Sequence, residues 1–118
     1  MTDKELLELA AKAVGIKGEF KREHQTYGDQ WIEGIDTGNR FWWNPLPDDG
    51  DALLLAVKLE LCITQWPSHS QYPPHVMVGY KTGPQSGKNW IQEYEGDAMA
   101  ANRRAIICAA AEIGKAMP

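Results

Sequence analysis

The sequence predicts an α+β domain in which a mainly antiparallel sheet of about four or five strands packs against three helices. Three observations predict it. Capped amphipathic segments stand at both ends of the chain, a more apolar helical segment stands in the middle, and runs rich in β-formers lie between them. The expected order is therefore helix, hairpin, helix, meander, helix. With 118 residues, 43% of them hydrophobic, the chain has the length of a single domain, over residues 1–118, and enough apolar side chains for a core.

The first segment has the start and stop signals of a helix. Thr2 and Glu5 have the spacing of a capping box, in which the threonine hydroxyl accepts from the third amide of the helix. Apolar residues then recur at three- and four-residue steps: Leu6, Leu9, Ala10, Ala13 and Val14. Gly15 supplies the left-handed stop. The pattern predicts a helix from Asp3 to Val14.

The next segment predicts a hairpin. Residues 17–30 are polar and alternate poorly, so we expect an exposed loop or a weak edge strand there. The run from Trp31 to Ile35 alternates as a strand does, residues 36–39 are turn residues, and the run from Phe41 to Trp43 is extended and aromatic. The hairpin is therefore expected between residues 31–35 and 41–43.

The middle of the chain predicts the most apolar helix. Pro45 and Pro47 stop the preceding strand, and Asp48 or Asp49 can cap a helix. From residue 52 to residue 61 the only polar side chains are Lys58 and Glu60. A helix that is apolar over most of its circumference is covered on more than one side. We therefore expect it to be the central packing element.

Three strands and a last helix are predicted beyond it. The runs LCITQW (61–66), HVMVGY (75–80) and WIQEYE (90–95) are separated by turn-rich segments and predict an antiparallel meander. Gly96 ends the last strand, and Asp97 can cap a helix. The apolar stripe of this helix consists of Met99, Ile106, Ala110, Ile113 and Met117, with Arg103 in one slot of the same stripe.

Net charge and cysteine content limit the possible binding partners and the cellular location of the protein. A net charge of −4 and a pI near 5.3 argue against a nucleic-acid or anionic-membrane binder, although a local basic patch at Lys17, Lys21 and Arg22 stays open. Cys62 and Cys108 lie in apolar contexts, where we expect buried free thiols. No signal peptide or apolar membrane span is visible, so we expect a soluble, cytoplasmic protein.

No pattern predicts catalysis or a cofactor. His69 and His75 are the only histidine pair that can approach a metal together, and zinc sites need three or four ligands. The acidic run at residues 48–51 lacks the rest of a calcium loop, and capping explains it. Ser68 and His69 are adjacent in the sequence, but adjacency does not provide the geometry of a catalytic triad. No phosphate-binding loop motif occurs. We expect no catalytic residue, no metal and no cofactor.

Five tryptophans are the least ordinary feature: Trp31, Trp42, Trp43, Trp66 and Trp90. Because adjacent residues of a strand point to opposite faces, one of Trp42 and Trp43 enters the core, and a helix, a partner or a ligand must cover the other. Arg103 either packs over the core and pairs with an aspartate or, with Arg104, contacts an acidic partner. The candidate interaction residues are Trp42, Trp43, Trp66, His69, Tyr72, His75, Arg103 and Arg104.

Three segments carry a family resemblance. The sequence W-N-P-L-P-D-D-G-D-A-L-L-L-A-V-K-L from Trp43 to Leu59, the opening TDKELLELAAKAVGI and the ending ANRRAIICAAAEIGKAM resemble small uncharacterised proteins of tailed bacteriophages and prophages. These are NinX-like members of the phage α/β/α sandwich domain group. The resemblance implies a fold and a phage or prophage setting, and it implies no activity. Residues 17–40 and 62–95 are not matched, and the long segment WPSHSQYPPH is a departure.

These observations favour a non-enzymatic accessory protein that binds a host or phage macromolecule, such as a host or phage protein. The alternative is a small-molecule or nucleotide binder that uses Trp43, Trp66 or His75 in a pocket near Tyr72. A small hydrolase is the least favoured hypothesis. A homodimer is also open, because a second copy would cover a surface tryptophan without a foreign partner.

Overall fold

The computed structural model describes residues 1–24, 30–38, 42–67 and 73–118, and within them the chain forms three helices and five strands. In chain order these are α1 (Asp3–Val14), β1 (Glu19–His24), β2 (Trp31–Asp36), α2 (Asp49–Lys58), β3 (Leu61–Trp66), β4 (His75–Tyr80), β5 (Asn89–Glu93) and α3 (Ala98–Ala116). Every pair of neighbouring strands is antiparallel. The predicted α+β fold is confirmed.

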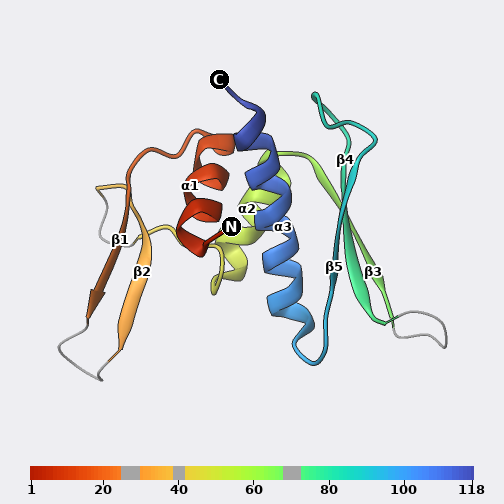
Figure 1. The fold of residues 1–118 in the computed structure, drawn as a ribbon, viewed down its shortest axis with the longest axis horizontal. Helices are drawn as coiled ribbons and strands as arrows, with labels where there is room; N and C mark the ends of the chain where they lie inside the picture. Colours follow the sequence, from red (N-terminus) through yellow and green to blue (C-terminus); the bar gives the residue numbers. More distant parts are fainter. Residues whose placement is uncertain (25–29, 39–41, 68–72) are drawn as a thin grey trace.

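The strands form two sheets with the helices between them. β1 and β2 make a two-stranded sheet on one side of the helices, and β3, β4 and β5 make a three-stranded sheet on the other (Figure 1). The sequence predicts a single sheet, and the resemblance implies a sheet between helices, so this layer order differs from both. The three-stranded sheet buries one face against the helical layer, whereas the two-stranded sheet contacts the core mainly through Ile35 and the half-buried Phe20.

α1 forms where the sequence predicts it. The Thr2 hydroxyl accepts a hydrogen bond of 3.2 Å from the amide of Glu5. Gly15 ends the helix with φ of 75°, a left-handed conformation that favours glycine. Leu6, Leu7, Ala10 and Ala11 make up the buried face.

The hairpin pairs differently from the prediction. β2 pairs along its whole length with β1, in the segment expected to be a loop or a weak edge strand. The expected partner contributes a single bridge between Ile35 and Trp43, and Phe41 lies outside the described residues. Pro45 stops pairing soon after that bridge. β1 lacks the apolar alternation of a half-buried strand. Cross-strand ion pairs, such as that between Arg22 and Glu33 at 2.8 Å, help to stabilise its pairing with β2.

α2 is not the central packing element, so that prediction is wrong. Of the two caps that the sequence allows, Asp48 caps the helix by accepting from the amide of Asp51 at 2.9 Å. Leu55 is fully buried, but Leu53 and Val57 are 59% and 66% exposed. α3 takes the central place instead, because alanines occupy most of its buried positions and let α1, α2 and β4 approach it together.

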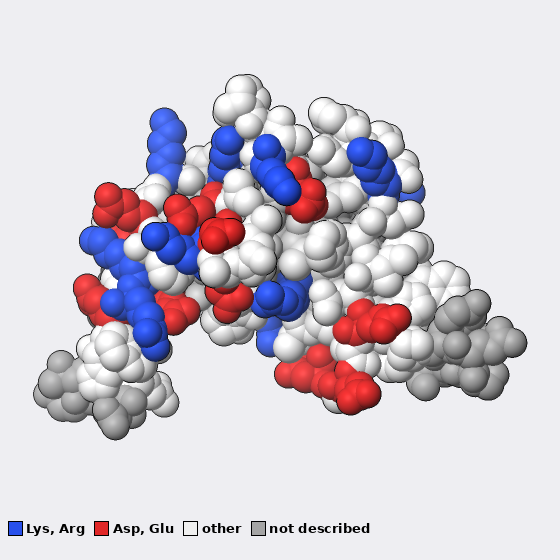
Figure 2. All heavy atoms as spheres, in the orientation of Figure 1, with Lys and Arg blue, Asp and Glu red and all other residues white. Residues whose placement is uncertain are grey.

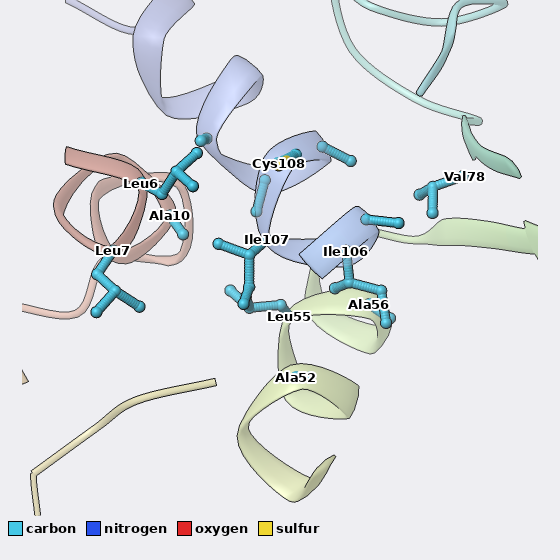
Figure 3. Close-up of a cluster of buried hydrophobic side chains, with 14 of the residues drawn as sticks. Leu6, Leu7, Ala10, Ala52, Leu55, Ala56, Val78, Ile106, Ile107 and Cys108 are labelled. Carbon is cyan, nitrogen blue, oxygen red and sulfur yellow. The ribbon is translucent and has the colours of Figure 1, made fainter. Parts of the chain in front are cut away.

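The core lies around α3. Figure 3 shows Ile107 of α3 and Leu55 of α2 pointing toward one another, and both belong to one cluster of buried side chains. α1 approaches α3 very closely at Gly114, where an added Cβ would fall 2.0 Å from the backbone oxygen of Leu9. The same two helices are joined at their ends by the hydrogen bond from Lys12 Nζ to the carbonyl of Met117, at 3.0 Å.

The meander of β3, β4 and β5 is confirmed, with β5 running over Asn89–Glu93 rather than residues 90–95. Val76, Val78 and Tyr80 of β4 are buried against the helices. Their register partners on the neighbouring strands share this inner face: Leu61, Ile63, Gln65, Trp90 and Gln92. The alternate residues of each strand therefore point away from the helical layer.

Tyr80 predicts a pH dependence of stability. Its hydroxyl donates a 3.0 Å hydrogen bond to the carbonyl of Ala109, and burial raises the pKa of Tyr80 to about 12. The unfolded chain loses this proton near pH 10. The stabilisation is therefore complete below about pH 10 and is lost as the pH rises toward 12. Between about pH 9 and pH 11.5, we expect the denaturant midpoint of the wild type to fall further than that of Tyr80→Phe. Equal falls would contradict this assignment.

Candidate functional site

The outer face of the three-stranded sheet carries two of the predicted interaction residues. It consists of nine residues in three cross-strand rows: Trp66, His75 and Glu93; Thr64, Met77 and Ile91; Cys62, Gly79 and Asn89. The rings of Trp66 and His75 are stacked, with centroids 5.9 Å apart. Trp66 is 47% exposed and Ile91 is 58% exposed. No described helix or strand covers this face (Figure 1).

The other tryptophans lie elsewhere. Trp43 is buried and Trp42 is half-buried, so the adjacent pair divides between core and surface as expected. Trp43 is bridged to β2, across the helical layer from Trp66 and His75 (Figure 1). The structure therefore does not bring these three residues into one pocket. His69 and Tyr72, the other expected members of that site, lie outside the described residues.

Trp31 and Trp90 take opposite roles. Trp31 stands exposed near the free end of the hairpin, where the guanidinium of Arg22 lies 4.3 Å from its ring centroid and His24 packs edge-on at 5.1 Å. Trp90 lies on the inner face of the sheet and packs against the core. The nitrogens of the Trp43 and Trp90 rings find no hydrogen-bond acceptor in the described part of the chain. Both of these rings serve mainly as apolar packing.

Arg103 lies in a pocket between α2 and α3. The pocket has a volume of about 230 Å³ and is lined by Asp49, Ala52, Leu53, Met99, Asn102, Arg103 and Ile106. Arg103 donates from Nε to the carbonyl of Leu46 at 2.6 Å and from Nη1 to Asp49 at 2.7 Å. Pairing with an aspartate is one of the two roles that the sequence left open for this arginine. It fixes Arg103 in the wall of the pocket and joins α3 to the start of α2.

Arg104 and two residues of the suggested basic cluster, Lys21 and Arg22, are also paired. Arg104 lies 3.2 Å from Asp3 of α1. In the hairpin, Lys21 lies 2.8 Å from Asp36, and this hydrogen bond raises the pKa of Lys21 and lowers the pKa of Asp36. Figure 2 shows basic and acidic side chains interspersed over the hairpin side of the molecule. Lys21 and Arg22 of the suggested basic cluster are therefore partly neutralised by Asp36 and Glu33.

The cysteines and histidines form no described metal centre. Cys108 is buried, and burial raises its thiol pKa. Cys62 is exposed on the outer face of the sheet, so its predicted burial is wrong, because the run LCITQW is covered on one face only. Within residues 1–24, 30–38, 42–67 and 73–118, no three side chains of the His, Cys, Asp or Glu type are close enough to hold a metal ion.

Sequence reasoning missed the apolar residues around the pocket. Leu53 and Val57 are one helical turn apart on the exposed side of α2, and Met99 of α3 is 56% exposed. The signal was the apolarity of α2 over most of its circumference, which also led to the prediction that this helix is covered on several sides. An apolar face that the fold leaves uncovered gives the same pattern.

Comparisons of the chain with protein-family models, with curated proteins and with solved structures found no significant match. The resemblance to phage proteins therefore stays a prediction. None of the helices in the described part of the chain is long and apolar enough to cross a membrane. The uncovered outer face of the sheet and the pocket between α2 and α3 are the observations that bear on function.

Proposed function

We propose that this chain is a non-enzymatic binding protein that holds an apolar segment of a host or phage protein in the pocket between α2 and α3. The observation that carries the proposal is the cluster of exposed apolar side chains at this pocket. Leu53 and Met99 line it, and Val57 extends the same ridge of α2 by one turn. Contiguous apolar patches larger than roughly a few hundred Å² on monomeric proteins commonly mark interaction sites.

The shape of the pocket suits a helix of the partner. Leu53 and Val57 are spaced as i and i+4, and Met99 stands on the neighbouring helix, so the exposed side chains flank a trough between two helices. Amphipathic helices bind in such troughs through anchors at helical spacing. The flexible side chain of Met99 can adapt to the shape of the anchor.

The charges at the pocket favour a partner with a basic group. Arg103 is already hydrogen-bonded to Leu46 and Asp49, and its side chain is 17% exposed. Asp49, the acidic residue of the lining, is 61% exposed. Asp48 and Asp51 stand at the same end of α2. We therefore expect an apolar helix with a lysine or arginine beside its anchors, which Asp49 can pair with.

A single exposed substitution tests the proposal. Leu53→Glu places a charge in the pocket wall, and the exposure of Leu53 leaves the fold intact. Bacterial proteins captured by the wild type are identified by mass spectrometry, and each is then purified and titrated. Since burying one leucine contributes about 1.5–3 kcal/mol, we expect Leu53→Glu to weaken a true partner by about tenfold or more.

Ile91→Glu is the matched control, because Ile91 is as exposed as Leu53 and lies on the outer face of the sheet. It introduces the same charge and should leave the affinity unchanged. Hydrogen exchange of the complex should show protection in α2 and in the first turns of α3. If Leu53→Glu binds every captured protein as tightly as the wild type and the control Ile91→Glu do, the pocket is not the binding site.

A further inference from the structure

We infer that the outer face of the β3–β4–β5 sheet packs against the same face of a second copy of this chain, about a two-fold axis that runs across the strands. In this arrangement each strand lies over its own counterpart in the opposite direction. The row of Thr64, Met77 and Ile91 lies on the axis, so each of its residues meets its own copy. The other two rows then exchange places, and the row of Trp66 faces the row of Gly79 of the second copy.

The chemistry of the face suits a copy of itself. Among its nine residues, Glu93 is the one acidic or basic side chain besides His75, although the whole chain carries a net charge of −4. Charged residues are depleted at the centres of protein interfaces, whereas aromatic residues and methionine are enriched. Two copies can therefore bring these faces together without placing like charges at the centre.

The shape of the face is complementary to itself under this symmetry. One end carries the stacked rings of Trp66 and His75. The other end carries the smaller side chains of Cys62 and Asn89, and the Asn89 carboxamide covers Gly79. A two-fold axis across the strands sets Trp66 over Cys62 of the second copy and His75 over Gly79 with the Asn89 carboxamide that covers it. Large side chains thus meet small ones, and Glu93 meets the amide of Asn89.

The other face-to-face symmetry is less favourable. An axis along the strands would place β3 over β5 of the second copy and each cross-strand row over the same row of the second copy. Trp66 would then press on Glu93, which would lose water without gaining a partner of opposite charge. His75 would meet the His75 ring of the other copy. The distribution of large, small and charged residues therefore selects the axis across the strands.

The size of the face sets the expected affinity. Three strands of five or six residues make a face of roughly 20 by 14 Å. Two such faces with their side chains bury on the order of 1,000 Å², near the lower limit for a specific interface. We therefore expect a dimer in the micromolar range, with the two sheets about 10 Å apart as in other packed sheets.

Charge reversal at the axis tests both the dimer and its symmetry. Because Ile91 meets Ile91, Ile91→Glu and Ile91→Lys each set two like charges together, and each should raise the dimer dissociation constant at least tenfold. An equal mixture of the two variants should restore a heterodimer, which sedimentation velocity and native mass spectrometry of the full chain would detect. Circular dichroism checks that each variant is folded, and the equally exposed Leu53→Glu should dimerise as the wild type does.

Three results would overturn the inference. They are a wild-type chain that stays monomeric up to about 500 µM, a dimer that Ile91→Glu leaves intact, and a mixture of the two variants that stays monomeric. This face is separate from the pocket between α2 and α3. If no dimer forms, the Leu53→Glu experiment still tests the proposed partner binding. If no partner binds the pocket, the Ile91 variants still test the dimer.

Discussion

Gly114→Ala is expected to lower the free energy of unfolding by about 3 kcal/mol, through overpacking at the closest approach of two helices. An added Cβ would fall 2.0 Å from the Leu9 carbonyl oxygen and 2.8 Å from its carbon. Both are backbone atoms, so α1 and α3 must move apart. In an open helix the same change stabilises by about 1 kcal/mol. The sign of the effect therefore reports packing alone. Chemical denaturation measures it, and the melting temperature should fall by roughly 10 °C.

Two variants make this test specific. Lys115→Ala changes the next residue of the same turn, which is exposed, and should shift stability by less than about 0.5 kcal/mol. Adding Leu9→Ala to Gly114→Ala should not restore stability, because the clash is with the backbone of Leu9 and not with its side chain. A Gly114→Ala protein as stable as the wild type would mean that the two helices do not meet at this glycine.

Ile107→Ala is expected to lower the free energy of unfolding by about 2–5 kcal/mol, because it opens a cavity in a fully buried site at the centre of α3. Ile107 meets Leu55 in the shared core of α2 and α3 (Figure 3). Val57→Ala, on the exposed side of α2, should cost less than about 0.5 kcal/mol. Urea denaturation of the two variants compares the helices directly.

The pair of variants decides which helix is central. A large cost at Ile107 with a small cost at Val57 is the result that the structure requires. A cost at Val57 as large as that at Ile107 would favour the sequence-based expectation, in which α2 is covered on several sides. Ile107→Val should lie between the two, at about 0.5–1.5 kcal/mol, because it removes a single methyl group.

Local signals predicted most of the elements correctly. The caps at Thr2, Asp48 and Asp97 and the left-handed Gly15 depend on residues within one turn, and the structure confirms each of them. The meander was also predicted, because its strands alternate and its connections are turn-rich. These features need no knowledge of what packs against them. They can therefore be predicted from a single sequence.

Features that depend on distant partners were not predictable in the same way. Residues 19–24 form β1 because β2 supplies matching charges, such as Glu33 opposite Arg22. The central place of α3 follows from the small size of its buried side chains, which periodicity alone does not measure. The division of the strands into two sheets depends on which faces the helices cover, and this is a property of the whole fold.

The candidate residues show the same limit. The stack of Trp66 and His75 follows from the register of β3 and β4, and their role as interaction residues stays a prediction. Sequence spacing did not show that the helices leave their face uncovered. It also did not show that Leu53, Val57 and Met99 are exposed around one pocket, because apolar residues in water and in a core have the same periodicity.

The pairing of α1 with α3 has a consequence for synthesis of the protein. Asp3 and Arg104, which contact each other across these helices, are 101 positions apart in the chain. At roughly 5–20 residues per second, α1 leaves the ribosome about 5–20 seconds before the helix that covers Leu6 and Leu7. During that interval its apolar face is open to chaperones and to other nascent chains. The hairpin and the meander can fold as they emerge, whereas the core closes only after translation has passed α3.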